Sequence, residues 1–248
     1  MLYRGAKPVM WSPVEKTALA EAEIEYEDIT STQIDVAFEI VESPIKELVG
    51  AYAVIWTTTP WTIPVNQAIA YGPDIEYVLI HHGDRRYLVA EDLCYGLSVR
   101  TGANERGSGA PPSGETKVTI YKGTDLAGTI ARHPLAKLVC PREGGDPGQA
   151  SADSALDSRL RGSTQEGGDA AERPATIHPE APLAEFFLRP RPFLPGDFVT
   201  TDSGTGLVHM APDHGEDDFD LCKEHGINPV FAVEGDGKYR ADWAWLGG

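Results

Sequence analysis

The sequence predicts a mainly β fold with a few flanking helices, arranged as a strand-rich barrel. Many short apolar or alternating runs are separated by Gly- and Pro-rich turn residues. Two such runs, at 77–80 and 85–90, flank the turn His-His-Gly-Asp at 81–84, as in a β-hairpin. Longer helical patterns occur at 91–100 and 216–225.

The first third of the chain predicts an irregular start followed by three strands. Residues 11–13 (Trp-Ser-Pro) form a turn, and 17–25 form a short helix or an irregular arm. Residues 34–40 alternate apolar and polar side chains, which is the period of a half-buried strand. Residues 52–57 form a continuous apolar run and therefore a buried strand, and 67–71 resume as a strand.

The middle of the chain contains two segments that lack the apolar content of a core. Residues 101–116 have the composition of a flexible loop, and 141–182 contain no aromatic residue. Such a composition cannot bury enough apolar surface to offset the entropy of ordering the backbone. We therefore predict a mobile insertion at about 141–182, with one short helix at 152–161. Short strands are predicted at 118–122 and 137–140.

Order is predicted to return near the C-terminus. An apolar run at 186–188 precedes 195–200, which reads as a turn into a strand. Residues 207–210 form a buried strand, and 216–225 form a helix that Gly226 ends.

Composition restricts the class of protein. The 248 residues suffice for one large domain or two small ones with a sizeable core. Three scattered cysteines form no C-x-x-C pair, and no apolar run approaches the roughly 20 residues that span a bilayer. The first residues lack the apolar core of a signal peptide, so we expect a soluble protein from a reducing compartment. A net charge of −17 argues against tight, nonspecific binding to nucleic acid.

The stretch 204–220 combines a Gly-Thr-Gly turn, a short strand, a tight loop and the start of a helix. This order brings His209, His214 and Asp218 near one another at a strand's exit, where ligands often bind. The alternative is structural, because acids in the first turn of a helix favour the helix dipole. A metal site from His209, His214, Asp217 and Asp218 is disfavoured, since Pro212 and Gly215 interrupt the His-x4-His spacing.

A second candidate is the threonine loop, which we define as residues 57–66. Thr57, Thr58 and Thr59 leave a buried strand, and Pro60 and Pro64 exclude both a helix and a central strand there. Hydroxyls and backbone N–H groups held in this way can bind a ribose or a carbonyl. The alternative is a β-branched strand end with a proline turn. The sequence contains no nucleophile elbow, no P-loop and no dinucleotide-binding glycine motif.

Together the two motifs closely resemble those of the editing domain of isoleucyl-tRNA synthetase, the insertion called connective peptide 1. The resemblance rests on Trp-Thr-Thr-Thr-Pro-Trp-Thr-Ile-Pro-Val-Asn at 56–66, Gly-Thr-Gly-Leu-Val-His at 204–209 and His-Gly-Glu-Asp-Asp-Phe at 214–219. Flanking matches extend it over nearly the whole chain except 101–116 and 141–182.

The resemblance implies a single editing domain over 1–248, built on the closed β-barrel of class I synthetases. It implies hydrolysis of valyl-tRNA for isoleucine, with valyl-adenylate as a further candidate substrate. Editing would be needed because the synthesis site gains only a few kcal/mol from the one methylene by which isoleucine exceeds valine; isoleucyl-tRNA synthetase is the standard illustration of this limit. The editing site would admit valine and refuse the larger isoleucine by size.

The same resemblance implies partners and cofactors. The partners are the acylated 3′ end of the isoleucine tRNA and the rest of the synthetase, in the cytoplasm, without a membrane. The His-Ile-Gly-His and Lys-Met-Ser-Lys-Ser signatures of the synthesis domain are missing from the sequence. The use of ATP and Mg²⁺ would therefore belong to a parent ligase outside this fragment, while editing itself is expected to need neither cofactor nor metal.

The resemblance also assigns roles to individual side chains. Asp218 matches the acid that pairs with the substrate's α-ammonium, and His209 matches the histidine that limits side-chain size. The predicted binding set is completed by polar residues of the threonine loop, which hold the terminal adenosine and line the pocket: Thr57, Thr58, Thr59, Thr62 and Asn66. No protein nucleophile is evident, so we expect a positioned water to attack the ester, with Asp218, His209 and the three consecutive threonines as the catalytic set.

Other functions stay open at this point. One is a noncatalytic barrel that binds an amino acid or adenosine, or an insertion kept for architecture. Another is an editing domain of valyl or leucyl specificity, whose threonine loop typically reads Thr-Thr-Arg-Pro. Met210 and Asp213 depart from the family pattern, which often has Thr and then Gly or Ser, and Asp213 adds negative charge near the loop.

Overall fold

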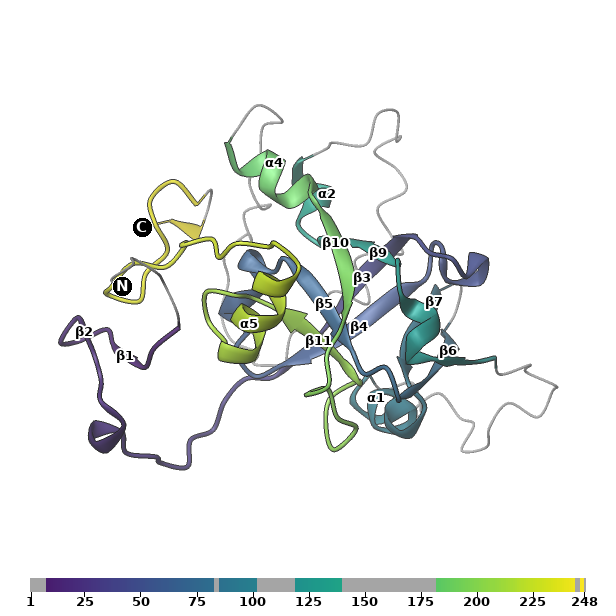
Figure 1. Ribbon diagram of the computed structural model, residues 1–248, viewed down its shortest axis with the longest axis horizontal. Helices are drawn as coiled ribbons and strands as arrows, with labels where there is room; N and C mark the ends of the chain where they lie inside the picture. The colour runs from purple at the N-terminus through teal and green to yellow at the C-terminus, as the bar shows by residue number, and fades with distance from the viewer. Residues whose placement is uncertain (1–7, 83–84, 102–118, 140–181, 244–245, 248) are drawn as a thin grey trace, which may run out of the picture.

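The computed structural model describes residues 8–82, 85–101, 119–139, 182–243 and 246–247. Within them the fold is mainly β, with one large mixed sheet and a few short helices around it (Figure 1). The predicted loop beyond Thr101 lies outside the described residues, as does the insertion predicted at about 141–182 with its helix at 152–161, except for Pro182, which begins a helix.

Counted over the described residues, the large sheet has nine strands in the order β11-β5-β10-β9-β3-β4-β7-β6-β8. The pairs β10–β5 and β4–β7 are parallel, and the other neighbours are antiparallel. A separate hairpin of β1 (Trp11–Ser12) and β2 (Thr17–Ala18) lies near the N-terminus. The strands of the large sheet are β3 (Ile34–Glu42), β4 (Tyr52–Thr57), β5 (Ala68–Tyr71), β6 (Glu76–His82), β7 (Arg85–Ala90), β8 (Ile120–Lys122), β9 (Ile130–Arg132), β10 (Pro190–Pro195) and β11 (Leu207–Met210).

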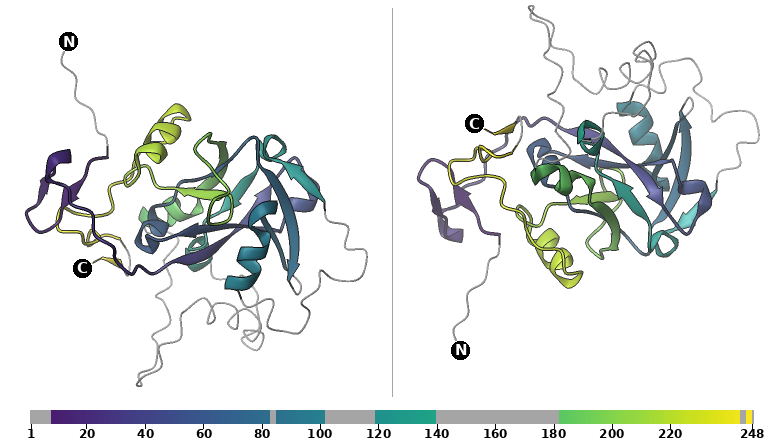
Figure 2. Two further views of the ribbon diagram at one scale, coloured as in Figure 1. Left: turned by 90° about the horizontal axis from the view of Figure 1, so that it is seen from below. Right: turned by 90° about the horizontal axis from the view of Figure 1, so that it is seen from above.

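The helices are short and lie at the ends and faces of the sheet (Figure 2). In the part of the chain that the structure describes, the α-helices are α1 (Cys94–Arg100), α2 (Ala136–Val139), α4 (Pro182–Leu188) and α5 (Glu216–Glu224). Single turns of 3₁₀ helix cover Glu21–Glu23, Lys46–Leu48, Glu91–Leu93 and Gly123–Leu126, and a longer one covers Pro60–Val65.

The central strand β4 is buried on both faces, which explains its uninterrupted apolar sequence. Ala53 and Ile55 belong to the main core of the curved sheet. Val54 points the other way and packs with Leu97 of α1. Alternate side chains of a strand face opposite sides of the sheet. Because the core covers one face of β4 and α1 covers the other, both sets of its side chains are apolar.

The sheet curls so that the turn before β11 reaches the far side of the core. The Thr205 carbonyl accepts a hydrogen bond from the Ala90 N–H at 2.8 Å, and the Gly206 carbonyl accepts one from the Tyr77 hydroxyl at 2.7 Å. Among the described residues the strand ladder does not run on from β8 to β11. The hydrogen bonds there show that the sheet curls, and a closed barrel stays a prediction.

Two predicted strands are wrong in their position or type. Residues 136–139 form helix α2, because Leu135 and Leu138 pack on the apolar cluster around α4; Cys140 lies outside the described residues. The strand expected at 195–200 instead occupies Pro190–Pro195, and Gly196 begins a turn. Its prolines fit because the strand pairs with β9 through 190–192 and with β5 through 193–195.

No helix among the residues the structure describes is long and apolar enough to cross a membrane.

The Gly206 position yields a stability prediction. Its φ is +75°, and a methyl group there would overlap the Cβ of Ala90. Gly226 has a similar φ of +71° but open space around it. We expect Gly206→Ala to lower the free energy of unfolding by about 1–3 kcal/mol more than Gly226→Ala, because only the first adds overpacking to backbone strain. Urea unfolding of both variants measures this; equal losses would contradict it.

Candidate functional site

The threonine loop begins where β4 ends. The Thr59 N–H donates to the Thr57 hydroxyl at 3.1 Å, and the two hydroxyls lie 3.2 Å apart. Thr57 is buried, whereas Thr58 and Thr59 are exposed. The Thr58 carbonyl accepts a hydrogen bond from Ser31 at 3.0 Å. The loop is thus fixed from within and from the N-terminal arm, while two of its residues remain accessible to a ligand.

The expectation that Pro60 and Pro64 exclude any helix is wrong. Pro60–Val65 forms a 3₁₀ helix with Pro60 at its first position. The first N–H groups of a helix have no partner within it, so proline costs nothing there. A short 3₁₀ helix also tolerates the missing N–H of Pro64, because its remaining ends are held by Thr59 and Asn66 backbone hydrogen bonds of 3.0 Å.

A buried hydrogen bond joins the two motifs. The hydroxyl of Thr62 lies 3.0 Å from Nε2 of His209, and it donates its own proton to the Thr59 carbonyl at 2.8 Å. A hydroxyl has one proton, so Thr62 must accept from His209. This fixes His209 as the tautomer with its proton on Nε2, and Nδ1 is then an acceptor.

His209 is held by strand pairing and kept neutral by burial. It pairs with Ile69 across β11 and β5, and only 8% of it is exposed. Burial, with a smaller effect of nearby His214, lowers the pKa of His209 to about 4. Its Nδ1 is buried and has no hydrogen-bond partner among the described residues. The ring is therefore a neutral, rigid wall with one free acceptor.

Asp218 occupies the first turn of α5, close to the end of β11. Its Oδ2 accepts a 2.7 Å hydrogen bond from the N–H of Ala211, two residues after His209. Burial raises the pKa of Asp218 to about 6, although the Ala211 hydrogen bond acts in the opposite direction. No Lys or Arg of the described ranges forms an ion pair with it. A desolvated carboxyl without a basic partner is typical of a functional position.

Asn66 is fully buried at the end of the threonine loop. Its Nδ2 donates to the Ala68 carbonyl at 2.8 Å, which ties the loop to β5. Its Oδ1 has no partner in the part of the chain that the structure describes. The side chain therefore supports the loop through one end and leaves one acceptor uncommitted.

The two departures from the family pattern differ in their surroundings. Met210 is fully buried in the apolar cluster under α5. Asp213 is partly buried, which raises its pKa to about 6, and its Oδ2 lies 4.0 Å from Nε2 of His214. The His214 ring in turn stands edge-on to Trp61, with centroids 4.7 Å apart. Asp217 is exposed on the first turn of α5.

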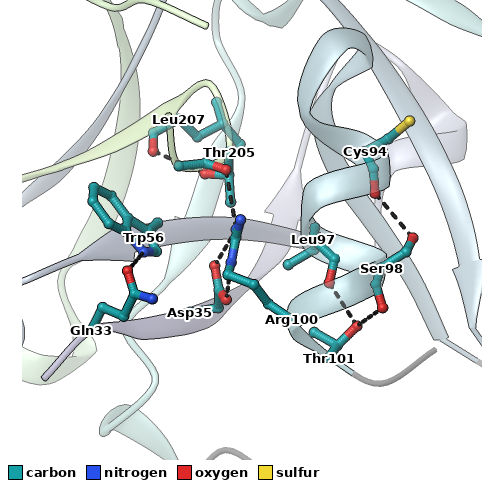
Figure 3. A network of polar contacts seen from close by, with 11 residues as sticks. Gln33, Asp35, Trp56, Cys94, Leu97, Ser98, Arg100, Thr101, Thr205 and Leu207 are labelled. Atoms are coloured by element: carbon teal, nitrogen blue, oxygen red, sulfur yellow. Dashed lines mark hydrogen bonds and ion pairs between the residues drawn. The ribbon is translucent and has the colours of Figure 1, made fainter. Parts of the chain in front are cut away.

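The Gly-Thr-Gly turn at 204–206 is anchored by a network that Figure 3 shows. Arg100, the last residue of α1, makes two 2.9 Å hydrogen bonds to Asp35 of β3 and one of 3.1 Å to the Gly204 carbonyl. Gly204 has φ +81°, and a Cβ there would lie 3.3 Å from the Trp56 ring. The turn thus places the start of β11 against both β3 and β4.

Two further residues support the threonine loop and were not predicted. His133 is fully buried; its Nε2 lies 3.0 Å from the Ile63 carbonyl, and its Nδ1 accepts the Leu135 N–H at 3.1 Å. Tyr239 donates its hydroxyl to the Trp61 carbonyl. His133 belongs to a flanking segment of the resemblance, which gave it no role, and Tyr239 lies outside both motifs; the three-dimensional fold brings them to the loop.

The arrangement offers hydroxyls, a neutral imidazole and the desolvated carboxyls of Asp218 and Asp213. Among the described residues, no three His, Cys, Asp or Glu side chains converge into a group that could hold a metal ion.

Comparison with known proteins identifies the family. The sequence model described as tRNA synthetases class I (I, L, M and V) matches residues 1–246. The chain belongs to the class I tRNA synthetase family. Members named isoleucine–tRNA ligase are the similar relatives: the Zymomonas mobilis enzyme is 49% identical over 100% of this chain, and the Gluconobacter oxydans enzyme is 42% identical over 98%.

The chain spans only about a fifth of the length of these relatives, 21% and 20% respectively. A crystal structure described as GlLeuRS-CP1 aligns with a TM-score of 0.45 and 14% identity, covering 82% of this chain and 72% of that one.

The hydrogen bond between Thr62 and His209 yields the second prediction. Thr62→Val removes the acceptor but keeps the shape, which leaves the buried Nε2–H of His209 unpaired. We expect a loss of about 1–3 kcal/mol in the free energy of unfolding. Thr62→Ser keeps the hydroxyl and is expected to lose less. Thermal or urea unfolding compares the two; a Val variant as stable as the Ser variant would contradict the assignment.

Proposed function

We propose that this part of a class I synthetase is an editing domain that hydrolyses valyl-tRNA for isoleucine. The observation that carries the proposal is the Thr62–His209 hydrogen bond, which unites the two motifs in one site. Similarity to isoleucine–tRNA ligases over the whole chain supports the choice of tRNA. The closed barrel expected of such a domain belongs to the same proposal.

Substrate binding is assigned to groups with matching chemistry. The ionised Asp218 carboxylate pairs with the α-ammonium of the aminoacyl ester, since it has no basic partner among the described residues. The exposed Thr58 and Thr59 offer hydroxyls and backbone groups to the terminal adenosine. The unpaired acceptors His209 Nδ1 and Asn66 Oδ1 are buried, so we assign them to an ordered water rather than to the ribose.

The reaction is ester hydrolysis by water. The water oxygen attacks the ester carbonyl carbon, and the bond between that carbon and the ribose oxygen breaks. The products are valine and a free hydroxyl on the tRNA end, which takes up a proton. A neighbouring ribose hydroxyl and the polar groups of the threonine loop position the water, so the catalytic contribution is mainly orientation and electrostatics.

Specificity is assigned to exclusion by size. His209 is buried, hydrogen-bonded and in a strand, so its ring cannot easily yield to a larger side chain. To refuse isoleucine, the pocket wall formed by His209 only has to stay rigid against a larger side chain. The synthesis site has the harder task of rejecting valine, which is smaller than isoleucine by one methylene. The same site is a candidate for valyl-adenylate.

The remaining assignments concern context. We place the domain in the cytoplasm, beside the rest of the synthetase, which delivers the acylated end that an acidic chain of charge −17 would bind weakly alone. Editing is proposed to need no cofactor, with ATP and Mg²⁺ used elsewhere in the parent ligase.

The direct test replaces two neighbouring acids. Asp218→Asn keeps the shape and an acceptor for Ala211 but removes the negative charge; we expect hydrolysis of valyl-tRNA to fall about 10- to 100-fold, the value of a charge-assisted contact. Asp217→Asn removes the same charge from an exposed position and is expected to change the rate by less than about twofold. Equal effects of both variants would contradict the ammonium anchor.

The pH dependence gives a fourth prediction. The pKa of Asp218 is raised to about 6 by burial, so its carboxylate form increases as the pH rises through 6. We expect valyl-tRNA hydrolysis, relative to Asp218→Asn, to rise from pH 5 through pH 6 and to level off above about pH 7. Rates measured on both proteins across this range and beyond the plateau test this; parallel profiles would overturn the assignment.

A further inference from the structure

The carbonyl of Trp61 lacks the donor that its helix would normally provide. In a 3₁₀ helix each carbonyl accepts a hydrogen bond from the N–H three residues further along the chain. For Trp61 this residue is Pro64, which has no N–H. The helix at Pro60–Val65 is therefore one hydrogen bond short at the turn that carries Thr62.

Tyr239 supplies the missing donor from the other end of the chain. Its hydroxyl donates to the Trp61 carbonyl. The ring is partly buried and lies beside Trp243, with centroids 6.1 Å apart. Burial raises the pKa of Tyr239 to about 12, so the hydroxyl keeps its proton and stays a donor at neutral pH.

The segment that presents Tyr239 is itself fixed. Val233 and Tyr239 form an antiparallel bridge, and the Glu234 N–H donates to the Lys238 carbonyl at 2.8 Å. Trp11 of β1 donates its indole N–H to the Gly235 carbonyl at 2.8 Å. In Figure 1 this C-terminal segment, in yellow, lies between the N-terminal hairpin and the body of the sheet. Tyr239 thus approaches the threonine loop from an anchored turn.

Planarity of the peptide bond links this contact to the site. The Trp61 carbonyl and the Thr62 N–H belong to one rigid peptide unit. Tyr239 holds the carbonyl end, and the Thr59 carbonyl accepts the Thr62 N–H at 3.0 Å. With both ends fixed, the peptide unit cannot rotate, which fixes the backbone at Thr62. The hydrogen bond from the Thr62 hydroxyl to the Thr59 carbonyl then directs that hydroxyl toward His209.

We propose that Tyr239 is a positioning residue of the editing site, which orients Thr62 and His209 by replacing the hydrogen bond that Pro64 removes. The proposal rests on the proposed function. It extends the site to a residue that lies 30 positions beyond His209 and outside both motifs. Tyr239 itself touches no reacting atom.

The test compares Tyr239→Phe with the unchanged chain. In single-turnover hydrolysis of valyl-tRNA, we expect the rate at saturating protein to fall about three- to tenfold, the effect of one lost hydrogen bond, with the half-saturating protein concentration unchanged. Tyr95→Phe is the matched control, because Tyr95 is 73% exposed on α1; it is expected to leave both values unchanged. A Tyr239→Phe rate equal to that of the control would overturn the proposal.

A second measurement separates this proposal from the proposed function. Hydrogen exchange of the Thr62 amide reports the geometry of the loop without any substrate. We expect faster exchange in Tyr239→Phe at Thr62 but not at the amides of β6 or β7. If no ester is hydrolysed even when the unchanged domain is part of its full-length synthetase, the proposed function fails, and the exchange result still supports or overturns the positioning role. Unaltered exchange at Thr62, or faster exchange throughout the sheet, would overturn it.

Discussion

The hydrogen bond between Thr62 and His209 is the constraint on which the site depends. Thr62 lies on the short helix between β4 and β5, and His209 stands on β11 at the edge of the sheet. The two meet because β5 pairs directly with β11, which places His209 opposite Ile69. The Gly-Thr-Gly turn before β11 is anchored to α1 and to the strands on the far side of the core. The buried hydrogen bond therefore depends on the pairing and register of β5 and β11.

Burial acts in opposite directions on the two groups that matter most for charge. It lowers the pKa of His209 to about 4 and raises that of Asp218 to about 6, because it penalises the cation in one case and the anion in the other. At neutral pH the histidine is uncharged and the aspartate is ionised. The site thus combines a neutral wall with the anionic Asp218. That combination suits a ligand with an apolar side chain beside an ammonium, in agreement with the proposed substrate.

Local sequence pattern correctly predicted the elements that are determined by residues close together in the chain. The strand at 52–57 matches β4 to the residue, and the hairpin at 77–90 and the helix from Glu216 are also confirmed. The failures involve proline and very short elements. Pro60 and Pro64 were expected to exclude a helix, but a 3₁₀ helix accommodates them. The prolines of β10 made this segment look unlike a strand, although it pairs with β9 in its first half and with β5 in its second half. The site residues came from motifs, yet Tyr239 and His133 could not, because their contacts span distant parts of the chain.

The measurement that tests the central claim most directly is hydrolysis of valyl-tRNA and isoleucyl-tRNA, both on the isoleucine tRNA. It is made with the purified chain at high concentration and repeated with the domain in its full-length synthetase, which supplies the tRNA contacts. The account predicts loss of the valyl ester while the isoleucyl ester is spared. Cleavage of both esters at equal rates, or of neither in the full-length enzyme, would contradict it.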